Sequence, residues 1–190
     1  SGMLAGKLTI DFLSTSTDVF YHFPNALPAI QRKDSIPLLT ENKLNPRILD
    51  NKKEKITIVT DAVPSFQTQA IDLKILDSIP SHKEITLVVD ESHSIGILGE
   101  NGAGIYSSIT NPNIKRKILV ASLGKALGLT GGVIASDSSF IQEIKNYDTF
   151  VSAAGMNPAY VQTLAQTGNL VQQQLKKLQD NLNYLAQHLQ

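Results

Sequence analysis

Hydrophobic residues along the chain fall into short runs that are separated by polar or glycine-containing segments. Four of these runs are rich in β-branched residues and predict buried strands: Ile56–Thr60, Ile85–Asp90, Lys117–Ser122 and Gly132–Ser136. Between the first two runs, apolar residues recur at helical spacing from Gln69 to Ile79, and Pro80 ends the pattern. A second short helix is expected from Ser138 or Ser139 to about Tyr147. Strands that alternate with helices predict an α/β fold, with a mainly parallel sheet flanked by helices.

The strongest periodicity lies toward the C-terminal end of the chain. Apolar residues spaced alternately by three and four run from Val161 to Leu189 and predict one long amphipathic helix. Asn157 suits its N-cap, and Pro158 suits its first turn, where a missing N–H is tolerated. We expect the helix to pack on the body of its own protein. A free-standing coiled coil is the alternative, although systematic flanking charge pairs are lacking.

These patterns divide the chain into three parts. Residues 1–54 are expected to be irregular, because four prolines interrupt any long element. Residues 55–157 form the predicted α/β core, and residues 158–190 form the long helix. We expect that helix to lead toward a C-terminal domain that is absent from the sequence. Ser1 and Gly2, before Met3, are interpreted as the remnant of a removed tag.

Composition limits the classes of partner. With 190 residues and 42% hydrophobic residues, the chain can build one domain with a core. Its 17 basic and 17 acidic residues leave no net charge, which predicts neither nucleic-acid nor membrane binding. There is no cysteine for a disulfide or a thiolate metal site. No apolar run approaches a membrane span, so we expect a cytoplasmic protein that binds a small molecule.

The first candidate chemistry follows the strand that ends at Asp90. This strand delivers a carboxylate and, three residues later, the imidazole of His93. A buried carboxylate needs a cation or strong donors, and a protonated pyridinium nitrogen would be one such partner. The alternatives are that Asp90 caps a turn and that His93 is a surface histidine. A metal site is less favoured, because the pair has no further ligand nearby in sequence.

The second candidate is Lys125, in Ser122–Gly128, directly after a buried strand. Desolvation among small residues would favour its neutral amine, which is the nucleophile that condenses with an aldehyde. Ser122 and neighbouring backbone N–H groups could bind a phosphate. The spacing does not fit a P-loop, and an ordinary surface lysine is the alternative. The glycine-rich stretch Gly99–Gly104 is by itself only a tight loop.

Taken in order, these segments resemble the fold-type I enzymes that use pyridoxal 5'-phosphate (PLP), and among them the α-oxoamine synthases. Asp90–Gly96, which leads into Gly99–Gly104, is similar to that family's Asp-x-x-His-x-x-Gly and glycine-rich motifs. Ser122–Gly128 is similar to its Schiff-base segment, and Thr60–Ser65 to its Thr-Asp-x-x-Phe-Ser motif. The resemblance covers about residues 55–170. It implies the large-domain fold of a PLP-dependent transferase.

The resemblance also implies roles for individual residues. Lys125 would hold the cofactor as a Schiff base and move the substrate α-proton. Asp90 would keep the pyridine nitrogen protonated. His93 and Ser65 would lie around the cofactor ring and its phenolic oxygen, and Ser122 would bind the phosphate. The substrates would be an amino acid and an acyl-CoA, and the enzyme would be a homodimer.

Other positions match the family less closely. His22 lies at about the family's distance before Ser65 for a histidine that stacks on the cofactor ring, and a structural histidine is the alternative. Leu8–Ser14 is similar to the family's early strand, but no counterpart of its N-terminal phosphate-cradling segment is recognised. Gln67-Thr68 and Ala153–Gly155 replace family residues, and the latter change removes hydroxyls that reach the neighbouring subunit's phosphate.

Three functions follow from this reasoning. The first is a PLP-dependent acyltransferase that condenses an acyl-CoA with an amino acid and releases its carboxylate. The second is an aminotransferase, which uses the same lysine and aspartate but no thioester. The third is a catalytically degenerate domain that acts through protein interaction, with the leucine-lined helix as its surface.

Overall fold

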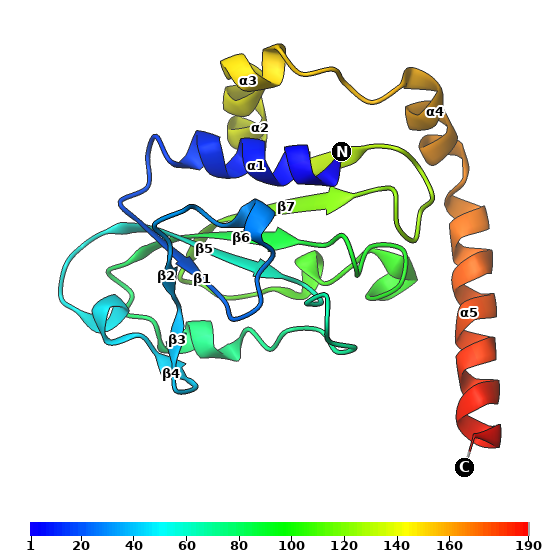
Figure 1. The fold of residues 1–190 in the computed structure, drawn as a ribbon, viewed down its shortest axis with the longest axis horizontal. Coiled ribbons are helices and arrows are strands. Elements are labelled where there is room, and N and C mark those ends of the chain that lie inside the picture. The colour runs from blue at the N-terminus through cyan, green and yellow to red at the C-terminus, as the bar shows by residue number, and fades with distance from the viewer. Residues whose placement is uncertain (190) are drawn as a thin grey trace.

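The computed structural model describes residues 1–189 and builds them around a six-stranded sheet (Figure 1). The strands lie in the order β2-β1-β5-β6-β7-β8, in which only β8 is antiparallel to its neighbour. Their bounds are β1 Val19–His22, β2 Ile36–Pro37, β5 Lys55–Asp61, β6 Glu84–Asp90, β7 Ile114–Ser122 and β8 Gly132–Ala135. The four strands expected from the hydrophobic runs are β5 to β8. The expected α/β fold with a mainly parallel sheet is therefore confirmed.

Both faces of the sheet are covered. One apolar cluster lies on the side of α1 (Gly2–Leu13) and α2 (Ser138–Lys145), and it includes Val59 and Val88. The other cluster includes Ile58 and Leu87, the neighbouring residues in β5 and β6. Successive residues of a strand point to opposite faces, so continuous apolar runs are what a sheet buried on both sides requires. Near the second face lie a small hairpin and the other 3₁₀ turns: β3 Leu39–Thr40, β4 Lys43–Leu44, η2 Pro46–Leu49, η3 Lys74–Ser78, η4 Glu100–Gly102 and η5 Tyr106–Ser108. The turn η1 (Pro28–Ile30) instead packs on α1 at the first face.

The N-terminal part differs from the expectation of an irregular segment. It supplies β1 and β2 to the sheet, and α1 occupies the place where Leu8–Ser14 resembled a strand. The buried residues Ala5, Thr9 and Leu13 recur every four positions, which explains why this segment is a helix that packs on β7 and β8. Ser1 caps the helix, because its hydroxyl accepts a hydrogen bond from the Leu4 N–H at 3.4 Å. The first two residues thus form the N-cap and the first position of this helix.

The helix expected from Gln69 to Ile79 is wrong. Only the turn η3 forms there, because Asp72 accepts a hydrogen bond from the Lys74 N–H and Ile71 donates its N–H to Ala62. A short aspartate that binds nearby backbone competes with helix formation. The apolar residues of the segment still face the core, where Leu76 is fully buried.

The C-terminal helical pattern forms two helices. They are α4 (Pro158–Gln166), capped by Asn157 as expected, and α5 (Gly168–His188). The break falls at Thr167 and Gly168, a β-branched residue followed by the residue with the lowest helix propensity after proline. The second expected short helix is confirmed as α2, with Asp137 as its cap, and α3 (Asp148–Val151) follows it. Among residues 1–189, no helix is both long and apolar enough to cross a membrane.

Candidate active site

The parallel strands β1, β5, β6 and β7 end at one edge of the sheet, where their last residues are His22, Asp61, Asp90 and Ser122. The paired register is continuous between β5 and β6, and Asp61 lies directly beside Asp90. Ligands of open α/β sheets bind at this carboxyl edge. The sequence motifs therefore meet at the edge where a site is expected.

Asp90 is almost completely buried, with 6% of its surface exposed. One of its carboxylate oxygens accepts a hydrogen bond from the Ser92 N–H at 2.8 Å. This contact is the turn cap that the sequence left as an alternative. It turns the chain directly after β6, so that the following residues reach back over the strand end.

His93 and Lys125 come together although 32 residues separate them. The Lys125 Nζ lies 2.6 Å from the His93 Nε2, and the His93 Nδ1 lies 3.2 Å from the Val63 carbonyl oxygen. A carbonyl only accepts, so Nδ1 carries the proton and Nε2 presents a lone pair to the lysine. Lys125 is exposed rather than desolvated, contrary to the expectation. The imidazole, and not burial, is therefore the feature that distinguishes this amine.

The segment from Glu91 to Gly104, which ends in the glycine-rich stretch, packs against the lysine segment. A Cβ on Gly96 would lie 3.1 Å from the Ala126 Cβ, so the loop packs closely on the lysine segment. Glu91, fully buried, holds the loop because its carboxylate accepts hydrogen bonds from the Ile105 N–H at 2.9 Å and from the Ser94 hydroxyl. Burial raises the pKa of Glu91, and these hydrogen bonds oppose the rise. Sequence reasoning missed Glu91, and its signal was a second acid directly after a buried strand.

Ser122 lies against the first residues of α1. A Cβ on Gly2 would lie 2.5 Å from the Ser122 Cβ, and the Ser122 N–H donates to the Ser92 hydroxyl at 2.8 Å. The Ser122 hydroxyl accepts a hydrogen bond from the Gly124 N–H at 3.3 Å. The N-terminus of a twelve-residue helix thus adjoins the predicted phosphate-binding serine. Helix N-termini carry free N–H groups and a partial positive charge that favour anions.

Ser65 and His22 contribute less to this arrangement. Ser65 is exposed in the loop after β5, two residues beyond Val63. His22 is engaged elsewhere, because its Nδ1 lies 2.8 Å from the Ser35 hydroxyl. Burial lowers the pKa of His22. These observations fit the structural histidine that the sequence left as an alternative.

Asp61 is the other residue that sequence reasoning missed. Only 4% of its surface is exposed, and its Oδ2 has no hydrogen-bond partner within residues 1–189. Burial, together with the charge of Asp90, raises the pKa of Asp61 to about 7. The sequence signal was its position in the Thr-Asp motif, but only the strand register places it beside Asp90.

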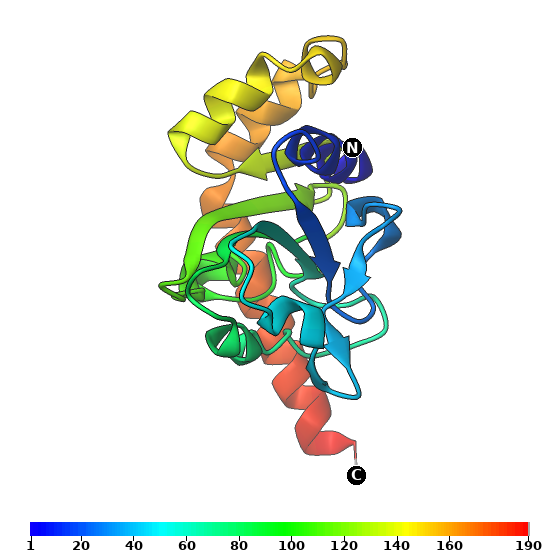
Figure 2. The same ribbon diagram turned by 90° about the vertical axis from the view of Figure 1, so that its left-hand side faces the viewer.

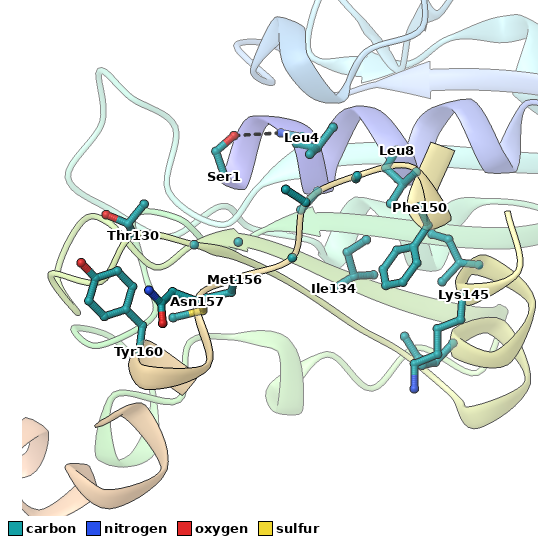
Figure 3. A pocket seen from close by; sticks show the side chains of 18 residues that line it. Ser1, Leu4, Leu8, Thr130, Ile134, Lys145, Phe150, Met156, Asn157 and Tyr160 are labelled. Atoms are coloured by element: carbon teal, nitrogen blue, oxygen red, sulfur yellow. Dashed lines mark hydrogen bonds between the residues drawn. The ribbon is translucent and has the colours of Figure 1, made fainter. Parts of the chain in front are cut away.

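A separate cavity of about 420 Å³ lies between α1, β8 and the α2–α3 region (Figure 3). Leu4 and Leu8 of α1 face Ile134 and Phe150 across it. The cavity touches the site at Ser1 and Gly132, but Lys125, His93 and Asp90 do not line it. Within the described part of the chain, no cluster of three or more potential metal ligands occurs.

Comparisons with known proteins assign most of the chain to one family. Residues 42–190 match the family model described as aminotransferase class I and II. A putative 8-amino-7-oxononanoate synthase of Rippkaea orientalis is 34% identical over 136 residues, which are 70% of this chain and 35% of that protein. A serine palmitoyltransferase of Sphingobacterium spiritivorum is 29% identical over 136 residues, or 70% of this chain and 34% of that protein.

The fold is also that of a solved relative. The structure of Sphingomonas wittichii serine palmitoyltransferase superimposes with a TM-score of 0.72 at 18% identity, over 90% of this chain and 45% of that one. The chain spans about a third of the length of the two curated relatives. Its sheet, its strand-end motifs and the family match over residues 42–190 lead to one conclusion: the chain belongs to the aminotransferase class I and II family and resembles its α-oxoamine synthases.

Proposed function

We propose that this chain forms the PLP-binding part of an acyltransferase that condenses an acyl-CoA with an amino acid, with loss of the carboxylate. The observation that carries the proposal is the contact of 2.6 Å between the Lys125 amine and the His93 imidazole, beside the buried Asp90. The names of the two curated relatives, an oxononanoate synthase and a palmitoyltransferase, favour acyl transfer over amino transfer.

The residues present fit the cofactor. Asp90 and Asp61 place two buried carboxyl groups side by side. The Asp61 Oδ2 has no hydrogen-bond partner within residues 1–189, so this pair can still accept a hydrogen bond. A pyridinium nitrogen is a cationic donor of the kind that such a site requires. Ser122 and the N-terminus of α1 offer a hydroxyl and N–H groups to a phosphate. Ala153, Ala154 and Gly155 add no hydroxyl to that cradle.

Each residue then has a defined task. The cofactor, when bound, supplies an aldehyde for the lysine and a ring that withdraws electrons from the substrate. His93, with its proton held on Nδ1 by Val63, accepts a proton from the Lys125 ammonium at Nε2. The lysine becomes a nucleophilic amine and can later take the α-proton of the substrate. Asp90 holds positive charge at the ring nitrogen, and the Gly96 contact keeps the lysine segment in place.

The first experiment is a PLP titration followed by absorbance. We expect a visible band that differs from that of free PLP, that is absent in Lys125→Ala and that is unchanged in Lys33→Ala, an exposed lysine used as the control. A folded protein that shows no such band would contradict the proposal. It would favour the degenerate domain, for which the exposed leucines Leu178, Leu182 and Leu185 of α5 offer a surface.

The second experiment separates acyl transfer from amino transfer. Amino acids are offered with acyl-CoA or with keto acids, and free CoA and product are measured. We expect release of CoA without dependence on a keto acid. Turnover that requires a keto acid and ignores acyl-CoA would make the protein an aminotransferase. Sedimentation at the same concentrations tests the homodimer that we also propose.

A further inference from the structure

Asp61 and Asp90 form a carboxyl pair that neither motif reveals by itself. They are the last residues of β5 and β6 and are direct partners in the parallel register. Side chains at paired positions of adjacent strands point to the same face, and their strands lie about 4.8 Å apart. With 4% and 6% of their surfaces exposed, both carboxyl groups are removed from water.

The surroundings do not balance two negative charges. The neighbour of Asp90 in β7 is the apolar Val120, and Ala62 donates its N–H to the Asp90 main-chain carbonyl rather than to a carboxylate. Asp61 receives a backbone hydrogen bond from Leu27 and the attraction of one cation, Lys125. That cation is already in contact with His93.

One proton resolves this conflict. Two adjacent carboxylates in a poorly solvated site do not both ionise easily, so one of them retains its proton to higher pH. The Ser92 N–H donates to Asp90 and favours the ionised form of that residue. The Asp61 Oδ2 accepts no hydrogen bond within residues 1–189, so nothing there stabilises a negative charge on it. When Asp61 is protonated, its carboxyl group instead carries an O–H donor. Asp61 is therefore the member of the pair that retains the proton.

We infer that Asp61 is a positioning residue that keeps its proton up to about neutral pH beside Asp90, so that the pair offers a single negative charge at the strand ends. The protonation belongs to the free protein. Its purpose rests on the proposed function: one negative charge matches one pyridinium cation, and the protonated Asp61 leaves that single charge on Asp90. Burial and the charge of Asp90 raise the pKa of Asp61 to about 7, so the second charge develops above neutral pH.

The test is a carboxyl ¹³C NMR titration of the full chain, labelled at aspartate and free of cofactor. We expect one carboxyl resonance with a midpoint near pH 7 in the wild type, and its absence in Asp61→Asn. Asp90→Asn removes the like charge, so the midpoint should fall while burial keeps it above that of an exposed aspartate. Amide spectra of each variant check the fold. Aspartate resonances that all titrate below about pH 5 would overturn the inference. So would a near-neutral midpoint that Asp90→Asn leaves unmoved.

A parallel PLP titration keeps this inference distinct from the proposed function. Asp61→Asn mimics the protonated acid in shape and in donor capacity, so it should bind PLP as the wild type does at pH 6. Its affinity should then lack the change between pH 6 and 8 that the wild type shows from loss of the Asp61 proton. Affinities of the two proteins that follow the same pH curve would remove the positioning role. Failure of the wild type to bind PLP, with the near-neutral resonance present, would reject the proposed function and retain the carboxyl pair.

Discussion

The helices α1 and α5 both carry recurring apolar residues, but they differ in how much of that apolar surface packs on the body. Seven of the residues of α1 are buried: Gly2, Ala5, Gly6, Leu8, Thr9, Ile10 and Leu13. In α5, which is almost twice as long, Leu175 alone is buried, and Figures 1 and 2 show its C-terminal end beyond the sheet. An apolar stripe therefore predicts a helix, but a facing surface decides whether that helix stabilises the fold. The site uses the docked helix, because α1 begins beside Ser122.

The largest expected effect comes from truncating a side chain of the docked helix. Leu8→Ala should lower the free energy of unfolding by about 2–5 kcal/mol, because a buried leucine leaves a cavity. Leu182→Ala in α5 is the matched control and should stay within about 0.5 kcal/mol. Urea unfolding measures both. Equal losses would mean that α5 is docked as firmly as α1.

The pH dependence of the unfolding free energy should also distinguish the sheet, which contains Asp61, from α5. Asp61 has a pKa of about 7 in the folded protein against 3.8 in the unfolded chain, so only the folded state holds its proton between these values. Stability is then greatest at low pH with respect to this group and falls as the pH rises from about 4 to 7. At 1.36 kcal/mol for each pH unit, the loss is on the order of 2–4 kcal/mol. Asp61→Asn should flatten this part of a plot of unfolding free energy against pH, whereas Asp180→Asn in α5 should leave it unchanged. A wild-type slope that survives in Asp61→Asn would contradict the assignment.

A smaller effect is expected where each helix begins. Gly2→Ala would place a Cβ 2.5 Å from the Ser122 Cβ and 2.6 Å from its Cα, so α1 must shift. Overpacking of this kind costs about 1–3 kcal/mol, and we also expect weaker PLP binding because the helix N-terminus moves. Gly168→Ala meets nothing within 4 Å and should be neutral or slightly stabilising. Thermal unfolding and PLP titration of the pair test the close approach. Identical behaviour of the two alanine variants would argue against it.

The smallest effect concerns the caps. Ser1→Ala removes the acceptor of the Leu4 N–H and should cost about 1 kcal/mol of global stability. Asn157→Ala removes the equivalent bond to the Ala159 N–H at 2.9 Å, but we expect local fraying of α4 that hydrogen exchange detects and global unfolding does not. A global loss in Asn157→Ala would show that α4 is coupled to the sheet.

Much of the sheet could be predicted because β5 and β6 are apolar on both faces, and a buried parallel strand needs no alternation. The motif residues could be predicted because each lies at the end of such a strand or within three residues of it: Asp90, His93, Ser122 and Lys125. The strand-like interpretation of Leu8–Ser14 failed because helical and strand periods are difficult to separate in a short apolar run. The break at Thr167 is a local preference that a continuous leucine pattern conceals. The pairing of Asp61 with Asp90 depends on register, which a single sequence does not state.

The glycine loop behind Lys125 has a consequence for how this sequence can change. Gly99 has a φ of 74°, and a Cβ there would overlap the carbonyl of Gly104, whose own Cβ would meet the Glu91 carboxylate. Every amino-acid replacement at Gly99 must therefore displace the backbone. Gly155 and Gly168 have open space around them. Random mutagenesis followed by selection for the folded protein should thus recover variants at Gly155 and Gly168 and almost none at Gly99. Gly99 is therefore expected to persist as the sequence evolves.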